Sequence, residues 1–69
     1  MLDHKLTIFY HTAKYLSTTK AAEELHLSQP AISKSIKELE KELEVTLFER
    51  EKGRFVLTPA GKYLLEKSE

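Results

Sequence analysis

The chain has 69 residues and a mass of 8.0 kDa, which is enough for one small domain but leaves little room for a large active-site cleft. Lys and Arg number 11, and Asp and Glu also number 11, so the formal net charge is zero and the chain is not a polycation that holds nucleic acid by bulk charge alone. The absence of cysteine excludes disulfide frameworks, cysteine zinc sites and thiol catalysis.

The sequence shows neither a secretion signal nor a membrane span. No stretch approaches the ~20 apolar residues that cross a bilayer, and the first residues lack the basic and then apolar pattern of a signal peptide. We therefore expect a single folded unit located in the cytoplasm.

Apolar residues near the start of the chain predict a first helix with two distinct faces. One stripe, expected to face the core, comprises Leu6, Phe9, Ala13 and Leu16. The opposite stripe comprises His4, Ile8, His11 and Tyr15. The apolar members of this second stripe have no evident partner within one chain, which favours a contact with a second copy.

A short second helix is predicted from about Lys20 to Leu25. Hydroxyl side chains at 17–19 interrupt the apolar period and can cap this helix. The small residues Ala21 and Ala22 face inward and allow another helix to cross closely.

A third helix is predicted from Ser28 to about Leu43. Ser28 is a strong cap, and Pro30 is tolerated in the first turn, where backbone donors lack an intrahelical partner. The inward face comprises Ile32, Ile36, Leu39 and Leu43. The far end carries acidic residues that we expect to be solvated and partly paired with lysines of the same helix, namely Glu38, Glu40, Glu42 and Glu44.

Residues 47–57 predict a small hairpin, because extended apolar residues flank Gly53, which can take the positive φ of a tight turn. Thr58 and Pro59 then resemble another cap and first-turn proline, which predicts a fourth helix. The expected order is helix, helix, helix, hairpin, helix.

This order describes a helix-turn-helix followed by a wing. In that arrangement the first turn of the third helix enters the major groove of DNA, and its exposed residues are Ser28, Gln29, Pro30, Ser33 and Lys34. Gln29 is the expected base reader, because its amide can both donate and accept at an adenine edge.

The sequence also resembles a known family over nearly its whole length. The segment 17–50 is similar to the N-terminal domain of LysR-type transcriptional regulators, and Leu57, Thr58, Ala60 and Gly61 match the start of the family's linker helix. The residues of the segment that match are Ala21, Ala22, Leu25, Ser28, Gln29, Pro30, Ala31, Ser33, Ile36, Leu39, Glu40, Leu47, Phe48 and Arg50.

The resemblance implies a mainly α fold, a winged helix-turn-helix with a three-helix core and a two-stranded wing. The DNA-binding domain would span 1–57, with the helix-turn-helix at about 18–43 and the wing at about 47–57. Residues 58–69 would begin a linker helix that is cut short. The implied DNA contacts, including the first turn of the third helix, are Thr19, Lys20, Ser28, Gln29, Pro30, Ser33, Lys34, Lys37, Arg50, Lys52 and Arg54.

Four positions depart from the family pattern. Glu44 stands where the family usually has a glycine, so a left-handed residue there would carry a strain of about 1 kcal/mol. Thr46 replaces a usual proline. Lys34 replaces a common arginine and loses bidentate hydrogen bonding. Ser35 replaces a frequent glutamine, so the family's base preference does not transfer to this chain.

The resemblance further implies that the linker helix pairs two subunits as a homodimer on double-stranded DNA. We expect the dimer surface to include Ile8, Tyr15, Tyr63 and Leu64. A small-molecule effector would be sensed by a C-terminal domain absent from this sequence, so the chain is expected to be an excised domain or a short relative.

No metal, cofactor or catalytic site is expected. His4 and His11 are ~10 Å apart along a helix and cannot share one ion, and no cluster supplies a base, a nucleophile and an oxyanion site. Two alternatives remain open: a LysR-like module of a ModE-type regulator, and a winged helix used for protein contacts. The second would require an apolar reading face.

Overall fold

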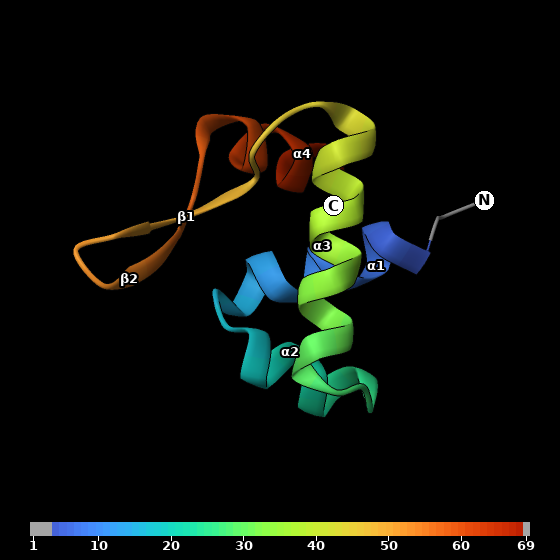
Figure 1. Ribbon diagram of the computed structural model, residues 1–69. Helices are drawn as coiled ribbons and strands as arrows, with labels where there is room; N and C mark the ends of the chain where they lie inside the picture. The colour runs from blue at the N-terminus through green and yellow to red at the C-terminus, as the bar shows by residue number, and fades with distance from the viewer. Residues whose placement is uncertain (1–3, 69) are drawn as a thin grey trace.

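The computed structural model describes residues 4–68, so the outermost residues of the predicted domain and linker lie outside it. Six elements follow in the predicted order (Figure 1). They are α1 His4–Tyr15, α2 Thr18–Leu25, α3 Gln29–Leu43, β1 Phe48–Glu51, β2 Arg54–Leu57 and α4 Pro59–Ser68. None of the helices in the described part of the chain is both long and apolar enough to span a membrane.

α1 is buried on a broader face than one stripe. Phe9 and Ala13 are buried as predicted, but Ile8 is buried as well, with 1% of its surface exposed. The buried Thr12 hydroxyl donates to the Ile8 carbonyl oxygen at 2.8 Å, so its polar group is satisfied within the helix. α1 is enclosed because α2, α3 and α4 all pack against it, which removes the second face from solvent at Ile8.

Two residues predicted for the core lie outside it. Leu16 is 44% exposed, because α1 ends at Tyr15 and Leu16 takes a left-handed conformation with φ of 50°. Leu43 is 46% exposed, because it is the last residue of α3 and the chain turns away there. The helical period therefore predicted the faces of the two helices but not where their burial stops.

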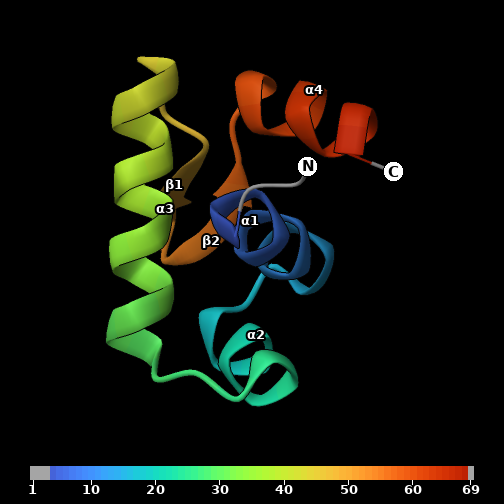
Figure 2. The ribbon, with the colours of Figure 1, turned by 90° about the vertical axis from the view of Figure 1, so that its right-hand side faces the viewer.

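The three-helix core is closed by small and branched residues. Ala21 and Ala22 of α2 are buried, and so are Ile32, Ile36 and Leu39 of α3. α3 lies along one edge of the molecule, and α1, α2 and α4 all lie to the same side of it (Figure 2). The opposite face of α3 is consequently exposed to solvent.

α3 is followed by a left-handed C-cap residue at the position where the family usually has a glycine. Glu44 has φ of 58° and ψ of 40°, and the Val45 amide donates to the Glu40 carbonyl oxygen at 3.1 Å. The Glu44 amide also donates to the Lys41 carbonyl oxygen at 3.3 Å, and the two bonds satisfy carbonyl groups that the helix end would otherwise leave unpaired. The exposed Glu44 side chain makes no hydrogen bond that offsets its backbone strain among the described residues.

We expect Glu44→Gly to raise the free energy of unfolding by about 0.5 to 1 kcal/mol, because glycine relieves the left-handed strain but adds freedom to the unfolded chain. Urea denaturation monitored by circular dichroism measures the change. Lys41→Gly, placed inside the same helix at an exposed position, is the control and should lower stability by about 1 kcal/mol. A destabilised Glu44→Gly variant would contradict the assigned backbone conformation.

The wing is a tight two-stranded hairpin. β1 and β2 pair antiparallel, with Arg50 opposite Phe55 and Glu51 opposite Arg54. Gly53 has φ of 78°, which confirms the prediction, and Lys52 beside it also has a positive φ of 52°. Positive φ at both central residues is the geometry of a type I′ turn, whose twist matches that of the strands.

α4 is capped and packed where the wing returns to the core. The Thr58 hydroxyl oxygen accepts from the Gly61 amide at 3.0 Å, which confirms the predicted cap. The same hydroxyl donates to the Thr46 carbonyl oxygen, and the Thr58 amide donates to the Leu47 carbonyl oxygen at 3.0 Å. These bonds tie the start of α4 to the segment that leads into the wing.

Candidate nucleic-acid interface

Two serine caps decide where the exposed helices begin. The Ser17 hydroxyl oxygen accepts from the Lys20 amide at 3.1 Å, so α2 starts at Thr18, two residues earlier than predicted. The Ser28 hydroxyl oxygen accepts from the Ala31 amide at 3.2 Å, so α3 starts at Gln29. Each cap supplies a partner for one of the amides that a helix start leaves unpaired.

All of the residues predicted to contact DNA are exposed on the surface. They come from the first turn of α2, the N-cap of α3, the part of α3 up to Lys37, and the wing. They are Thr19, Lys20, Ser28, Gln29, Pro30, Ser33, Lys34, Lys37, Arg50, Lys52 and Arg54.

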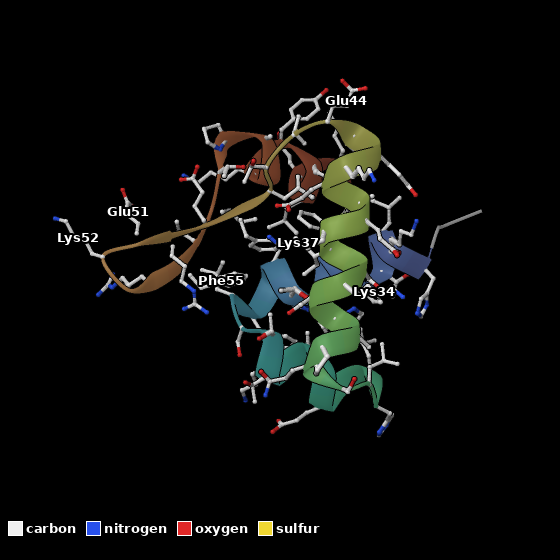
Figure 3. The ribbon with its side chains drawn as sticks, in the orientation of Figure 1. Lys34, Lys37, Glu44, Glu51, Lys52 and Phe55 are labelled. Carbon is white, nitrogen blue, oxygen red and sulfur yellow. The ribbon has the colours of Figure 1, made fainter. Side chains whose placement is uncertain are left out.

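A groove of about 380 Å³ lies between α3 and the wing. It brings together four of the predicted residues: Gln29, Ser33 and Lys37 from α3 and Arg50 from β1. Lys37 lies on the side of α3 that faces the wing, whereas Lys52 lies at the far tip of the wing (Figure 3). Pro30, Lys34, Lys52 and Arg54 do not line this groove.

Arg50 is held in place by aromatic rings. Its guanidinium lies 5.4 Å from the centre of the Phe55 ring, and Phe55 stacks on Phe48 with ring centres 4.7 Å apart. A cation over an aromatic face is attracted by the ring's quadrupole. Arg50 also lines a second, smaller hollow with Thr18 and Thr19. The wing therefore faces the start of α2 across this hollow.

Sequence reasoning missed Thr18, which lines both hollows. Its hydroxyl donates to Gln29 Oε1 at 3.5 Å, which joins the first residues of α2 and α3. The residues stand eleven positions apart in the chain, so no helical spacing could have indicated the contact.

The acidic end of α3 is arranged differently from the prediction. Glu38 and Glu42 pair with Lys5 of α1, with 3.8 Å between Lys5 Nζ and a Glu38 carboxylate oxygen, and not with lysines of their own helix. Within residues 4–68, Lys34 and Lys37 form no ion pair. The positive charge near the start of α3 is therefore available to an external anion.

Glu40 is not a solvated acid either. Its carboxylate oxygen Oε2 accepts from the Leu47 amide at 2.7 Å and from the Phe48 amide at 3.3 Å. Bonds from backbone amides to a carboxylate are charge-assisted and strong. One residue in the last turn of α3 thus holds the segment that enters the wing.

The predicted dimer surface is corrected at Ile8. Ile8 is buried within a single chain, because the neighbouring helices enclose this face of α1, and so it offers no surface to a second copy. Leu64 is partly buried and packs against the core. Tyr15 and Tyr63 are 38% and 63% exposed, so these two tyrosines are the members of the predicted set that a second copy could contact.

No group of three His, Asp or Glu side chains within residues 4–68 is placed to hold a metal ion. The chemistry of this surface is instead that of amides, hydroxyls and unpaired cations around a protruding helix and a hairpin. These features define a winged helix-turn-helix protein.

The family follows from comparison with known proteins. The family model described as bacterial regulatory helix-turn-helix protein, lysR family, matches residues 4–62. The chain therefore belongs to the LysR family of bacterial regulatory helix-turn-helix proteins.

Individual relatives agree with this assignment. The HTH-type transcriptional regulator YcgK of Bacillus subtilis is 53% identical over 57 residues, which are 83% of this chain and 18% of that protein. The chain thus spans about a fifth of the length of the curated relatives that it matches. A crystal structure of a LysR-family transcriptional regulator from Eggerthella lenta is 37% identical, with a TM-score of 0.91 and coverage of 97% of this chain and 96% of that chain.

A further solved structure contains nucleic acid. The complex of the CbnR DNA-binding domain with DNA is 37% identical, with a TM-score of 0.88 and coverage of 99% of this chain and 78% of that chain.

Proposed function

We propose that this chain is the sequence-specific DNA-binding domain of a LysR-type transcriptional regulator. In this proposal α3 enters the major groove and the wing contacts the adjacent groove or the backbone. The observation that carries the proposal is the groove in which Gln29, Ser33 and Lys37 of α3 meet Arg50 of the wing. Its reading face is polar and basic, which favours DNA over an apolar protein partner.

The exposed residues divide into two roles. Gln29, Ser33 and Lys34, near the start of α3, would contact base edges in the major groove. Phosphates or the minor groove would be contacted by the remaining polar and basic residues, namely Thr19, Lys20, Ser28, Lys37, Arg50, Lys52 and Arg54. Pro30 would pack against the groove wall. The proposed activity is binding and involves no catalysis.

The full regulator is proposed to act as a cytoplasmic homodimer. With a formal net charge of zero, one copy has little excess charge with which to hold DNA. Useful affinity would therefore require two domains joined through their linker helices, with the exposed Tyr63 of α4 at the contact. Effector sensing would belong to the part of the regulator beyond this domain.

A titration of labelled duplexes at several salt concentrations tests the proposal. The logarithm of the association constant is expected to fall by about 0.9 for each phosphate that the protein neutralises. A pool of randomised duplexes should also yield an enriched sequence. Weak binding that does not change with salt would refute DNA binding.

Two variants separate base reading from phosphate contact. Gln29→Ala should lower the discrimination between the preferred duplex and a mismatched one by about 1 to 3 kcal/mol. Lys52→Ala at the wing tip should instead weaken binding to all duplexes alike and reduce the salt slope by about one phosphate. Unchanged base preference in Gln29→Ala would show that α3 does not read the groove as proposed.

A further inference from the structure

The contact between Thr18 and Gln29 links the start of α2 to the start of α3. Ser17 caps α2 and Ser28 caps α3, so both residues are fixed as the first residues of their helices. The Thr18 hydroxyl donates to Gln29 Oε1 at 3.5 Å, and both side chains line the groove beside the wing. Thr18 is half-buried and Gln29 is exposed.

This contact leaves the two ends of the Gln29 amide unequal. The hydroxyl of Thr18 occupies one acceptor position of the amide oxygen, while the amide nitrogen has no hydrogen-bond partner among residues 4–68. Both protons on that nitrogen are free to bind an acceptor. In the major groove, guanine presents two acceptors, N7 and O6, whereas adenine presents one acceptor and one donor.

We infer that Thr18 is a positioning residue that orients the Gln29 amide, so that Gln29 donates to guanine in preference to binding adenine through both of its ends. The inference rests on the proposed function and assigns a base preference to it. Replacing the hydroxyl by a methyl group of similar shape removes the bond that turns the amide oxygen toward α2. Gln29 can then rotate to present both its oxygen and its nitrogen to the base, which is the bidentate geometry that suits adenine.

Thr18→Val tests this inference, and we expect it to leave the fold intact. The cap of α2 is Ser17 and not Thr18, so the substitution removes no helix cap. Valine keeps the branched shape of threonine and loses only the hydroxyl. Thr18→Ser restores the hydroxyl and serves as the matched control, and Gln29→Ala removes the group that Thr18 is inferred to orient.

Selection from randomised duplexes with the unsubstituted protein and with Gln29→Ala first identifies the base pair that Gln29 reads. Dissociation constants are then measured for duplexes with guanine or adenine at that position. The unsubstituted protein and Thr18→Ser should both prefer guanine. Thr18→Val should lower the ratio of guanine to adenine affinity by about 2- to 4-fold, the lower part of the range that one hydrogen bond controls, because 3.5 Å is a long distance for a bond between two oxygens. In the Gln29→Ala background, Thr18→Val should have no further effect.

The two proposals fail in different ways. If no duplex shows an affinity that falls with rising salt concentration, DNA binding itself is refuted. If Gln29→Ala abolishes discrimination but Thr18→Val retains the full preference for guanine, only the positioning role is refuted. A preference for adenine in the unsubstituted protein, or an equal loss of affinity for both duplexes in Thr18→Val, would also overturn it.

Discussion

Gly61→Ala is expected to lower the free energy of unfolding by about 2 to 3 kcal/mol, because the new methyl group would be forced into neighbouring atoms. A Cβ at Gly61 would overlap the Leu47 carbonyl oxygen and lie 2.7 Å from Leu57 Cδ2. The first of these is backbone, which cannot rotate away as a side chain can. For a domain of this size the loss corresponds to a fall in melting temperature of roughly 10 to 20 °C.

The sign of this effect discriminates between two descriptions of α4. Gly61 lies in a helix, where alanine would stabilise by up to about 1 kcal/mol if nothing lay nearby. A gain in stability would therefore show that α4 does not pack on Leu47. Gly53→Ala in the wing turn is the matched control. Its Cβ would meet nothing within 4 Å. It should cost only about 1 to 2 kcal/mol for the positive φ.

Glu40→Ala is the second substitution with a large expected effect. It removes the acceptor for the Leu47 and Phe48 amides and should lower the free energy of unfolding by about 2 to 3 kcal/mol, since unpaired buried donors and lost charge-assisted bonds are both unfavourable. The wing also loses its tie to α3, so DNA affinity should fall even at temperatures where the variant is folded.

Hydrogen exchange measured by NMR checks the local cause. The Leu47 and Phe48 amides should exchange faster in Glu40→Ala, and Glu40→Gln should lie between the two because its amide oxygen can still accept. Glu38→Gln on the same helix is the control. It alters an ion pair whose acid is 46% exposed, so stability should change by less than about 1 kcal/mol. Equal losses in Glu38→Gln and Glu40→Ala would argue that Glu40 holds no particular contact.

Local signals in the sequence predicted every helix and the hairpin. Ser17, Ser28 and Thr58 cap their helices, and Gly53 takes a positive φ. Each of these features depends on residues within about four positions along the chain, which is the range of capping and turn geometry. The exposed face of α3 could be predicted for the same reason, because helical periodicity relates residues only three or four positions apart.

Features that depend on distant partners could not be predicted in this way. Ile8 is buried because three other helices pack against α1. Leu16 and Leu43 are exposed because they lie at the ends of α1 and α3, at the edge of the core. Lys5 pairs with Glu42 from 37 positions away. Helical spacing favoured partners three or four residues away on the same helix, but the fold brings α1 closer to these acids.

By itself, the sequence determined the class of this protein, the order of its elements and the polar residues at the start of α3. Only the tertiary structure decided how these residues are held: Thr18 against Gln29, Arg50 over Phe55, Glu40 on the entry to the wing, and the wing against α4 at Gly61. The reason is physical. A cap or a turn is set by neighbouring backbone, whereas these contacts join segments that meet only after the core has closed.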